Sequence, residues 1–185
     1  MEHNLFKSRT FEEGKHSVTG DCNGLSMATR WELETPIFAR EINKHIGKEV
    51  FTVLDYGTGV GRIAKELMKL NEKITVIGVD DSSDQLKQAK EYINHNRFLP
   101  MLPHELGQTV DLCYCIYVLQ HVPAVELRGV LQRIHHFLKD CGIFIYGSSD
   151  YRMAIRFDGK GFHDDRYLGV NIQEEISRAQ RYPDQ

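Results

Sequence analysis

The chain has no long apolar run: no stretch approaches the roughly 20 residues that a helix needs to span a bilayer. Its N-terminal stretch, MEHNLFKSRTFEEGKH, lacks the apolar segment of a secretory signal. It also has no basic block, because 23 Lys and Arg stand against 26 Asp and Glu, so nothing points to a long nucleic-acid interface. These absences predict a cytoplasmic protein without a membrane partner, for which nucleic acid is not the expected partner.

Cysteine is scarce and never has the spacing of a metal site. The four cysteines are Cys22, Cys113, Cys115 and Cys141, and no two of them form a Cys-x-x-Cys pair. Cys113 and Cys115 lie in an apolar, strand-like run, where we expect them to share one face as small hydrophobic side chains. We therefore predict free thiols in a reducing compartment and no metal centre.

What the sequence does contain is an alternation of strand-like and helical patterns. Four apolar runs are typical of buried strands, at 50–56, 74–80, 110–119 and 143–147. A short fifth strand is expected near Phe98. Helical spacing is found at 60–70, from Ser82 onward, and from Pro123 to the turn Asp140-Cys141-Gly142. Strands that are apolar on both faces, each followed by a helix, predict an α/β fold: a Rossmann-like doubly wound, mostly parallel sheet flanked by helices.

The length of 185 residues suits a single domain. We divide it into an N-terminal arm or lid (1–29), a leading helix (30–47), a cofactor-binding core (48–148) and a C-terminal extension (149–185). In the leading segment, Thr35 is expected to cap a helix from Pro36 to Ile46. In the extension, YRMAIRF is expected as strand or loop, and a last helix is expected at 173–181.

The turn after the first strand carries three glycines, Gly57, Gly59 and Gly61, in the stretch VLDYGTGVG. A nicotinamide dinucleotide fingerprint would be Gly-x-Gly-x-x-Gly, but here Arg62 takes the third glycine's place. Arg62 itself is expected to start the helix and face solvent. Asp55 precedes the turn, and its carboxylate suits a cationic ligand better than a pyrophosphate. The pattern thus argues against an NAD(P)-dependent oxidoreductase, which remains an alternative.

Four segments, in order, resemble the class I S-adenosylmethionine-dependent methyltransferases. VLDYGTGVG is similar to that family's nucleotide-binding motif, and VIGVDDS to its second strand. VDLCYCIYVLQHV resembles the fourth-strand motif, and LQRIHHFLKDCGIFIYG the helix, turn and strand that follow. The likeness spans roughly residues 50–148. It implies an enzyme that binds S-adenosyl-L-methionine, transfers its methyl group and releases S-adenosyl-L-homocysteine.

The resemblance also implies the site. Asp80 would hold both ribose hydroxyls, and Asp55 would act in the first turn near the methionine amino group. The full set of predicted cofactor-binding residues is Asp55, Tyr56, Gly57, Thr58, Gly59, Gly61, Asp80, Asp81, Met101, Cys115, Ile116 and Tyr117. His121 is the candidate general base. Further candidates are Arg30 and Trp31, to cover the cofactor, and Tyr151 with the run 163–165, to reach an acceptor.

The chain departs from the family's patterns in ways that bear on the acceptor. Enzymes that methylate exocyclic amines of bases carry an Asn/Asp-Pro-Pro-aromatic motif where this chain reads CIYVLQH, and neither Cys113 nor Cys115 stands in the setting of a cytosine-C5 nucleophile. We therefore expect a small-molecule acceptor.

The third strand is blurred, with FLPMLP the best candidate for contacting adenine, and only 38 residues (148–185) follow Gly147. We expect the usual closing hairpin of strands to be absent, through truncation or a rearranged end. These departures keep a further alternative open, a non-catalytic cofactor-binding or partner subunit with the same fold. The oligomeric state is not predicted.

Overall fold

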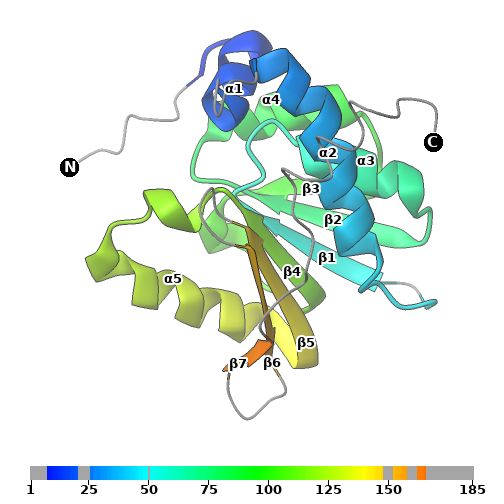
Figure 1. Ribbon diagram of the computed structural model, residues 1–185, viewed down its shortest axis with the longest axis vertical. Coiled ribbons are helices and arrows are strands. Elements are labelled where there is room, and N and C mark those ends of the chain that lie inside the picture. Colours follow the sequence, from blue (N-terminus) through cyan, green and yellow to red (C-terminus); the bar gives the residue numbers. More distant parts are fainter. Residues whose placement is uncertain (1–7, 21–25, 50, 148–151, 158–161, 166–185) are drawn as a thin grey trace.

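A seven-stranded sheet forms the centre of the protein (Figure 1). The computed structural model describes residues 8–20, 26–49, 51–147, 152–157 and 162–165. The strands are β1 Phe51–Tyr56, β2 Ile74–Val79, β3 Phe98–Met101, β4 Val110–Ile116, β5 Leu138–Gly147, β6 Arg152–Phe157 and β7 Phe162–Asp165. They lie in the order β3-β2-β1-β4-β5-β6-β7, with β1 to β5 parallel and the last two antiparallel.

The strand order reverses at β1, which pairs with β2 on one side and with β4 on the other. In open α/β sheets, the crevice at the carboxyl ends of the strands on either side of such a switch is where ligands bind. The glycine turn follows β1 directly, so the fold places it at this crevice.

Helices cover both faces of the sheet. They are α1 Phe11–Thr19, α2 Met27–Asn43, α3 Arg62–Leu70, α4 Ser83–Ile93 and α5 Ala124–Phe137, with short 3₁₀ turns η2 Pro103–Glu105 and η3 Leu119–His121. Figure 1 shows α2, α3 and α4 against one face, α1 above the carboxyl ends of the strands, and α5 on the other face. The layered α/β fold predicted from the alternating patterns is confirmed.

Successive residues of each inner strand are buried on opposite faces. Val53 of β1 belongs to the core under α2, α3 and α4, whereas its neighbour Leu54 belongs to the core under α5. Cys113 and Cys115 both lie on the α5 side, as their spacing predicts, and both are free thiols. The double burial explains why these strands read as continuous apolar runs.

The leading helix starts earlier than predicted. Its cap is Ser26, whose side chain accepts a hydrogen bond from the Thr29 amide, and Pro36 lies inside the helix rather than at its start. The expected start was wrong because one interior proline removes only a single amide donor, while the buried side chains on both sides of it hold the helix together. Part of the predicted arm is also helical, as α1.

The end of α5 also differs from the expectation. The helix stops at Phe137 and β5 begins at Leu138, so the predicted turn Asp140-Cys141-Gly142 lies inside the strand. Cys141 has a left-handed φ of 64°, and the pairing of β4 with β5 shifts register between Val110 and Leu112. The turn-like residues therefore make an irregularity in the strand instead of ending the helix.

The sheet does contain a closing hairpin, contrary to the expected absence. β6 pairs antiparallel with β5, and β7 pairs antiparallel with β6. The polar residues of YRMAIRF obscure the strand pattern in the sequence, but backbone pairing to β5 does not require apolar side chains on both faces. The predicted helix at 173–181 lies outside the described residues.

No helix among the described residues combines the length and the apolar character that crossing a membrane would need. The cytoplasmic location stays a prediction.

The α5 face offers a matched test of the core. Ile134 of α5 is fully buried against the sheet, while Val125 on the same helix is 90% exposed. We expect Ile134→Ala to lower the free energy of unfolding by about 2–5 kcal/mol, because it leaves a cavity. Val125→Ala should change it by no more than about 0.5 kcal/mol. Urea denaturation followed by circular dichroism measures both, and equal effects would contradict the assigned burial.

Candidate active site

The glycine turn has a backbone that only glycine adopts readily. Gly57, Gly59 and Gly61 have φ of 80°, 54° and 78°, all left-handed. The amides of Gly57 and Thr58 both donate to the carbonyl of Val79, at distances of 2.7 and 2.9 Å, and so fasten the turn to the end of β2. The chain thus turns sharply at the end of β1, and at the three glycines it presents backbone without a side chain.

Asp80 joins the glycine turn to the next loop. One carboxylate oxygen accepts a hydrogen bond from the Gly59 amide at 2.9 Å, and the other accepts from the Ser82 amide at 2.9 Å. Burial raises the pKa of Asp80, against the opposing effect of these two donors. The acid predicted to hold the ribose therefore lies in direct contact with the glycine turn.

Asp55 is buried below the turn, with 4% of its surface exposed. Its Oδ2 accepts a hydrogen bond from the Thr58 hydroxyl at 2.7 Å. Burial raises the pKa of this carboxyl from 3.8 to about 7, although the Thr58 hydroxyl works in the opposite direction. A buried acid of this kind ionises more readily beside a positive charge, so the surroundings of Asp55 favour a cation.

Two valines cover the glycines. A Cβ added at Gly59 would lie 2.6 Å from Val18 Cγ1 of α1, and one added at Gly57 would lie 2.3 Å from Val118 Cγ2, beyond β4. Both valines must therefore touch the bare glycine backbone. Apolar side chains thus cover the glycine turn at two of its three glycines.

Helix α1 lies over this region and is held by both hydrogen bonds and aromatic contacts. Ser17 accepts a hydrogen bond from the Gln85 side chain of α4 at 3.2 Å, and the Gln88 side chain donates to the carbonyl of Ser8 at 2.9 Å. Phe11 stacks against Tyr92 of α4, with ring centroids 4.7 Å apart, and meets Trp31 of α2 edge-on. We call α1 the cover helix because it lies across the glycine turn. Trp31 is thereby placed at its outer edge, as an anchor for Phe11.

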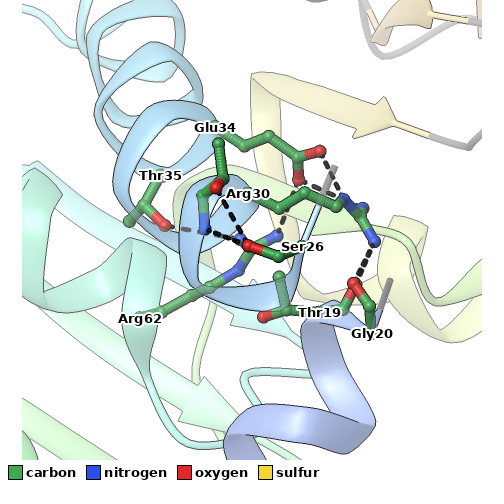
Figure 2. A network of polar contacts seen from close by, with 8 residues as sticks. Thr19, Gly20, Ser26, Arg30, Glu34, Thr35 and Arg62 are labelled. Atoms are coloured by element: carbon green, nitrogen blue, oxygen red, sulfur yellow. Dashed lines mark hydrogen bonds and ion pairs between the residues drawn. The ribbon is translucent and has the colours of Figure 1, made fainter. Parts of the chain in front are cut away.

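A buried ionic network lies beside the turn (Figure 2). Glu34 accepts from Arg30 Nε at 2.7 Å and lies 3.6 Å from a nitrogen of Arg62. Arg62 is buried, so the expectation that it faces solvent was wrong. Burial lowers its pKa, and Glu34 opposes that shift. An arginine at the start of a helix can turn inward when, as here, a carboxylate meets it there.

The end of β4 borders the same crevice. Tyr117 has a left-handed φ of 62°, which is uncommon for a residue other than glycine. Its ring meets Phe38 edge-on at 5.5 Å, and the Arg30 guanidinium lies 5.6 Å from its centroid. Ile116 packs on this same side of the sheet. Such backbone geometry is often found where a ligand is bound.

Other predicted residues face elsewhere. The side chains of Tyr56, Cys115 and Met101 pack into the core on the α5 side, so any cofactor contact from them would use the backbone or the strand end. Asp81 is exposed beside Asp80. His121 ends η3, is exposed, and has Nε2 3.2 Å from the Gln120 amide nitrogen.

The remaining candidates belong to the C-terminal extension. The backbone of 163–165 lies in β7, and Tyr151 falls outside the described residues.

Comparison with known proteins gives the class of the site. Residues 53–142 match the family model described as a methyltransferase domain. This stretch contains the glycine turn, Asp80 and the end of β4. The resemblance of these motifs to the class I S-adenosylmethionine-dependent methyltransferases is therefore confirmed. The oxidoreductase alternative is not supported.

Curated relatives agree with this class. The sterol 24-C-methyltransferase erg6 of Aspergillus fumigatus is 29% identical over 140 residues, which is 70% of this chain and 36% of that protein. The carboxy-S-adenosyl-L-methionine synthase of Nautilia profundicola is 25% identical over 149 residues, which is 75% of this chain and 61% of that protein. The chain thus spans between a third and two thirds of the length of these relatives.

Solved structures share the fold. The magnesium protoporphyrin IX methyltransferase of Synechocystis, determined with S-adenosylhomocysteine bound, gives a TM-score of 0.53 at 18% identity, over 76% of this chain and 60% of that one. A methyltransferase in complex with the Trm112 activator of Haloferax volcanii also gives 0.53, at 21% identity, over 64% and 54% of the two chains.

The residues of the crevice fit S-adenosylmethionine, the cofactor of this domain class. Bare glycine backbone allows the close approach of a nucleoside, and Asp80 offers acceptors at the end of β2 where a ribose diol would need them. The buried Asp55 suits a ligand that carries a sulfonium and an ammonium group.

Sequence reasoning missed several residues here. Glu34 was not singled out, although its spacing four residues after Arg30 on a helix is a recognisable ion-pair signal. Val18 and Val118 had no signal at all, because each meets its glycine only through the tertiary fold.

Alanine at the central glycine tests the packing of the cover helix. Gly59→Ala would force a side chain into a left-handed backbone and against Val18, so we expect a loss of about 1–3 kcal/mol of stability and faster proteolysis within α1. The control is Gly129→Ala in α5, where nothing lies within 4 Å and helix propensity should add up to about 1 kcal/mol. Urea titrations and timed trypsin digestion provide the measurements; a neutral Gly59→Ala would contradict the geometry.

The raised pKa of Asp55 predicts a pH dependence. Between about pH 4 and pH 7 the folded protein holds a proton on Asp55 that the unfolded chain has lost, so this group makes stability fall as pH rises, by at most about 1.4 kcal/mol per pH unit. Asp55→Asn remains neutral and should remove that part of the slope. Unfolding free energies at several pH values for wild type, Asp55→Asn and the exposed control Asp140→Asn give the comparison. Parallel curves for all three would show that Asp55 titrates normally.

Proposed function

We propose that this chain transfers the methyl group of S-adenosylmethionine to a small-molecule acceptor. The observation that supports the proposal is the contact between Asp80 and the Gly59 amide at the switch point, because it puts the acid that we expect to bind the ribose diol next to the glycine turn. Both features belong to the segment that matches the methyltransferase domain.

The cofactor supplies an electrophilic methyl group on a positively charged sulfur. The chain's own residues would bind and orient it: Asp80 through the ribose hydroxyls, the glycine turn through backbone contact, and Asp55 through its charge near the cationic end. The cover helix and Val118 would exclude water from the crevice. Alignment and exclusion of water are the main contributions that such a displacement needs from a protein.

The end of β4 is where the acceptor would meet the methyl group. Tyr117, with its left-handed backbone, and the following turn η3 border this position. His121 remains our candidate for the general base, since an imidazole can take a proton near neutral pH. In this structure its ring is exposed, so it would have to act from the rim of the crevice.

Support for a small acceptor comes from the relatives' names. They include sterol 24-C-methyltransferases and, among the solved structures, enzymes acting on coclaurine and on magnesium protoporphyrin IX. These names describe the relatives, and they suggest which small molecules to test first as methyl acceptors for this chain.

Isothermal titration with S-adenosylhomocysteine tests the proposal. We expect binding by the wild type, weakening of at least about tenfold in Asp80→Asn, and a change of less than about twofold in Asp84→Asn, an exposed acid in the first turn of α4. NADH should give no heat. A folded wild type that binds neither S-adenosylmethionine nor S-adenosylhomocysteine would overturn the proposal.

Transfer itself requires a second assay, in which labelled methyl groups are followed into the small-molecule fraction of an extract. Binding without transfer to any compound would favour the alternative of a non-catalytic subunit with this fold.

A further inference from the structure

A single buried carboxylate connects segments that border the cofactor site (Figure 2). Glu34 of α2 accepts from Arg30 Nε at 2.7 Å and from Arg30 Nη2 at 3.2 Å, and its Oε2 lies 3.6 Å from Arg62 Nη2. The side chains of Glu34 and Arg62 are each 6% exposed, and that of Arg30 is 11% exposed. Unlike exposed ion pairs, a pair this deep is expensive to break, because removing one charge leaves the other without compensation.

Arg30 carries the link to the cover helix. Its Nη1 donates to the carbonyls of Thr19 and Gly20, where α1 ends. Figure 2 shows the guanidinium between these carbonyls and Glu34. Val18, the residue before Thr19, is the one that touches Gly59. The position of α1 over the glycine turn therefore depends on how Glu34 holds Arg30.

Arg62 carries the link to the turn itself. It is the first residue of α3 and directly follows Gly61, and a second nitrogen donates to the Thr35 hydroxyl at 3.3 Å. A third link reaches the end of β4, since the Arg30 guanidinium lies over the ring of Tyr117. Glu34 thus holds two arginines, and these two arginines contact the end of α1, the start of α3 after the glycine turn, and Tyr117 at the end of β4.

We propose that Glu34 is the positioning residue of the cofactor site. It would act through Arg30 and Arg62 and not by contact with the cofactor or the acceptor. It keeps the cover helix, the glycine turn and Tyr117 in one arrangement, and so sets how long a bound nucleoside is retained. This role rests on the proposed function, and it adds a residue that lies outside the segment matched by the methyltransferase model.

A residue that only stabilised the fold would act differently. Its loss would lower global stability and affect every region alike, whereas loss of a positioning residue loosens one element selectively. Hydrogen exchange resolves this difference along the chain without any ligand. The dissociation rate of S-adenosylhomocysteine resolves it at the site.

The test compares wild type with Glu34→Gln in the full chain. Without ligand, the amides of α1 should exchange at least about tenfold faster in the variant, while those of β1, β2 and β4 change by less than about twofold. S-adenosylhomocysteine should dissociate at least about tenfold faster by stopped flow, and Glu34→Asp should recover part of the loss. The matched control is Glu66→Gln, which removes an exposed ion pair with Lys69 on α3 and should alter neither readout.

A folded Glu34→Gln protein with unchanged α1 exchange and unchanged dissociation would overturn the role of Glu34. Uniform acceleration in the strands as well would reduce it to a stabilising residue and overturn it equally. Should Glu34→Gln fail to fold, Arg30→Gln leaves Glu34 with Arg62 and must still release α1, or the proposal fails. A wild type that binds no S-adenosylhomocysteine would instead refute the proposed function, and the exchange comparison would still decide the link to α1.

Discussion

The structure depends on a turn in which three backbone positions, at Gly57, Gly59 and Gly61, adopt left-handed geometry. That geometry brings the chain from the buried end of β1 into α3 within a few residues and turns two amides toward the end of β2. Asp80 then closes the arrangement by accepting from the Gly59 amide. Because glycine has no side chain, neighbouring elements reach the backbone directly at these three positions, and the cover helix, Val118 and the ionic network are all arranged around the turn.

Much of this fold follows from the sequence for a plain physical reason. Strands buried on both faces, such as β2 and β4, must be apolar throughout, and that signal does not depend on distant partners. The boundaries of α2 and of β5 could not be derived in the same way. Pro36 and Cys141-Gly142 are local stop signals, and the packing around them overrides both. The hairpin of β6 and β7 escaped prediction because its stability comes from pairing to β5 rather than from its own pattern.

The residues of the site also fall into two groups, those that local sequence predicts and those that depend on tertiary packing. Glycines and an acid at a strand end are constraints written into the local sequence, so the turn and Asp80 could be named beforehand, and the structure places them in contact. The contacts of Val18 and Val118, and the inward turn of Arg62, arise only when segments far apart in the chain come together. A charged residue in a polar stretch looks solvent-exposed until a buried partner such as Glu34 is known. The burial of Arg62 and Glu34 therefore arises only when the core is assembled.

The nine-residue length of α1 has a consequence for how the helix is kept in place. A helix this short is barely stable by itself in water, since few of its residues gain a complete set of backbone bonds. Arg30 donates hydrogen bonds to carbonyl groups at the end of α1, and these carbonyls point in a common direction only while the helix is intact. The helical form of α1 therefore depends on the neighbours that hold it, the side chains of α4 beneath it and Arg30 of α2 at its end. A change that removes these contacts would cost the segment its helical structure as well as its place beside Gly59.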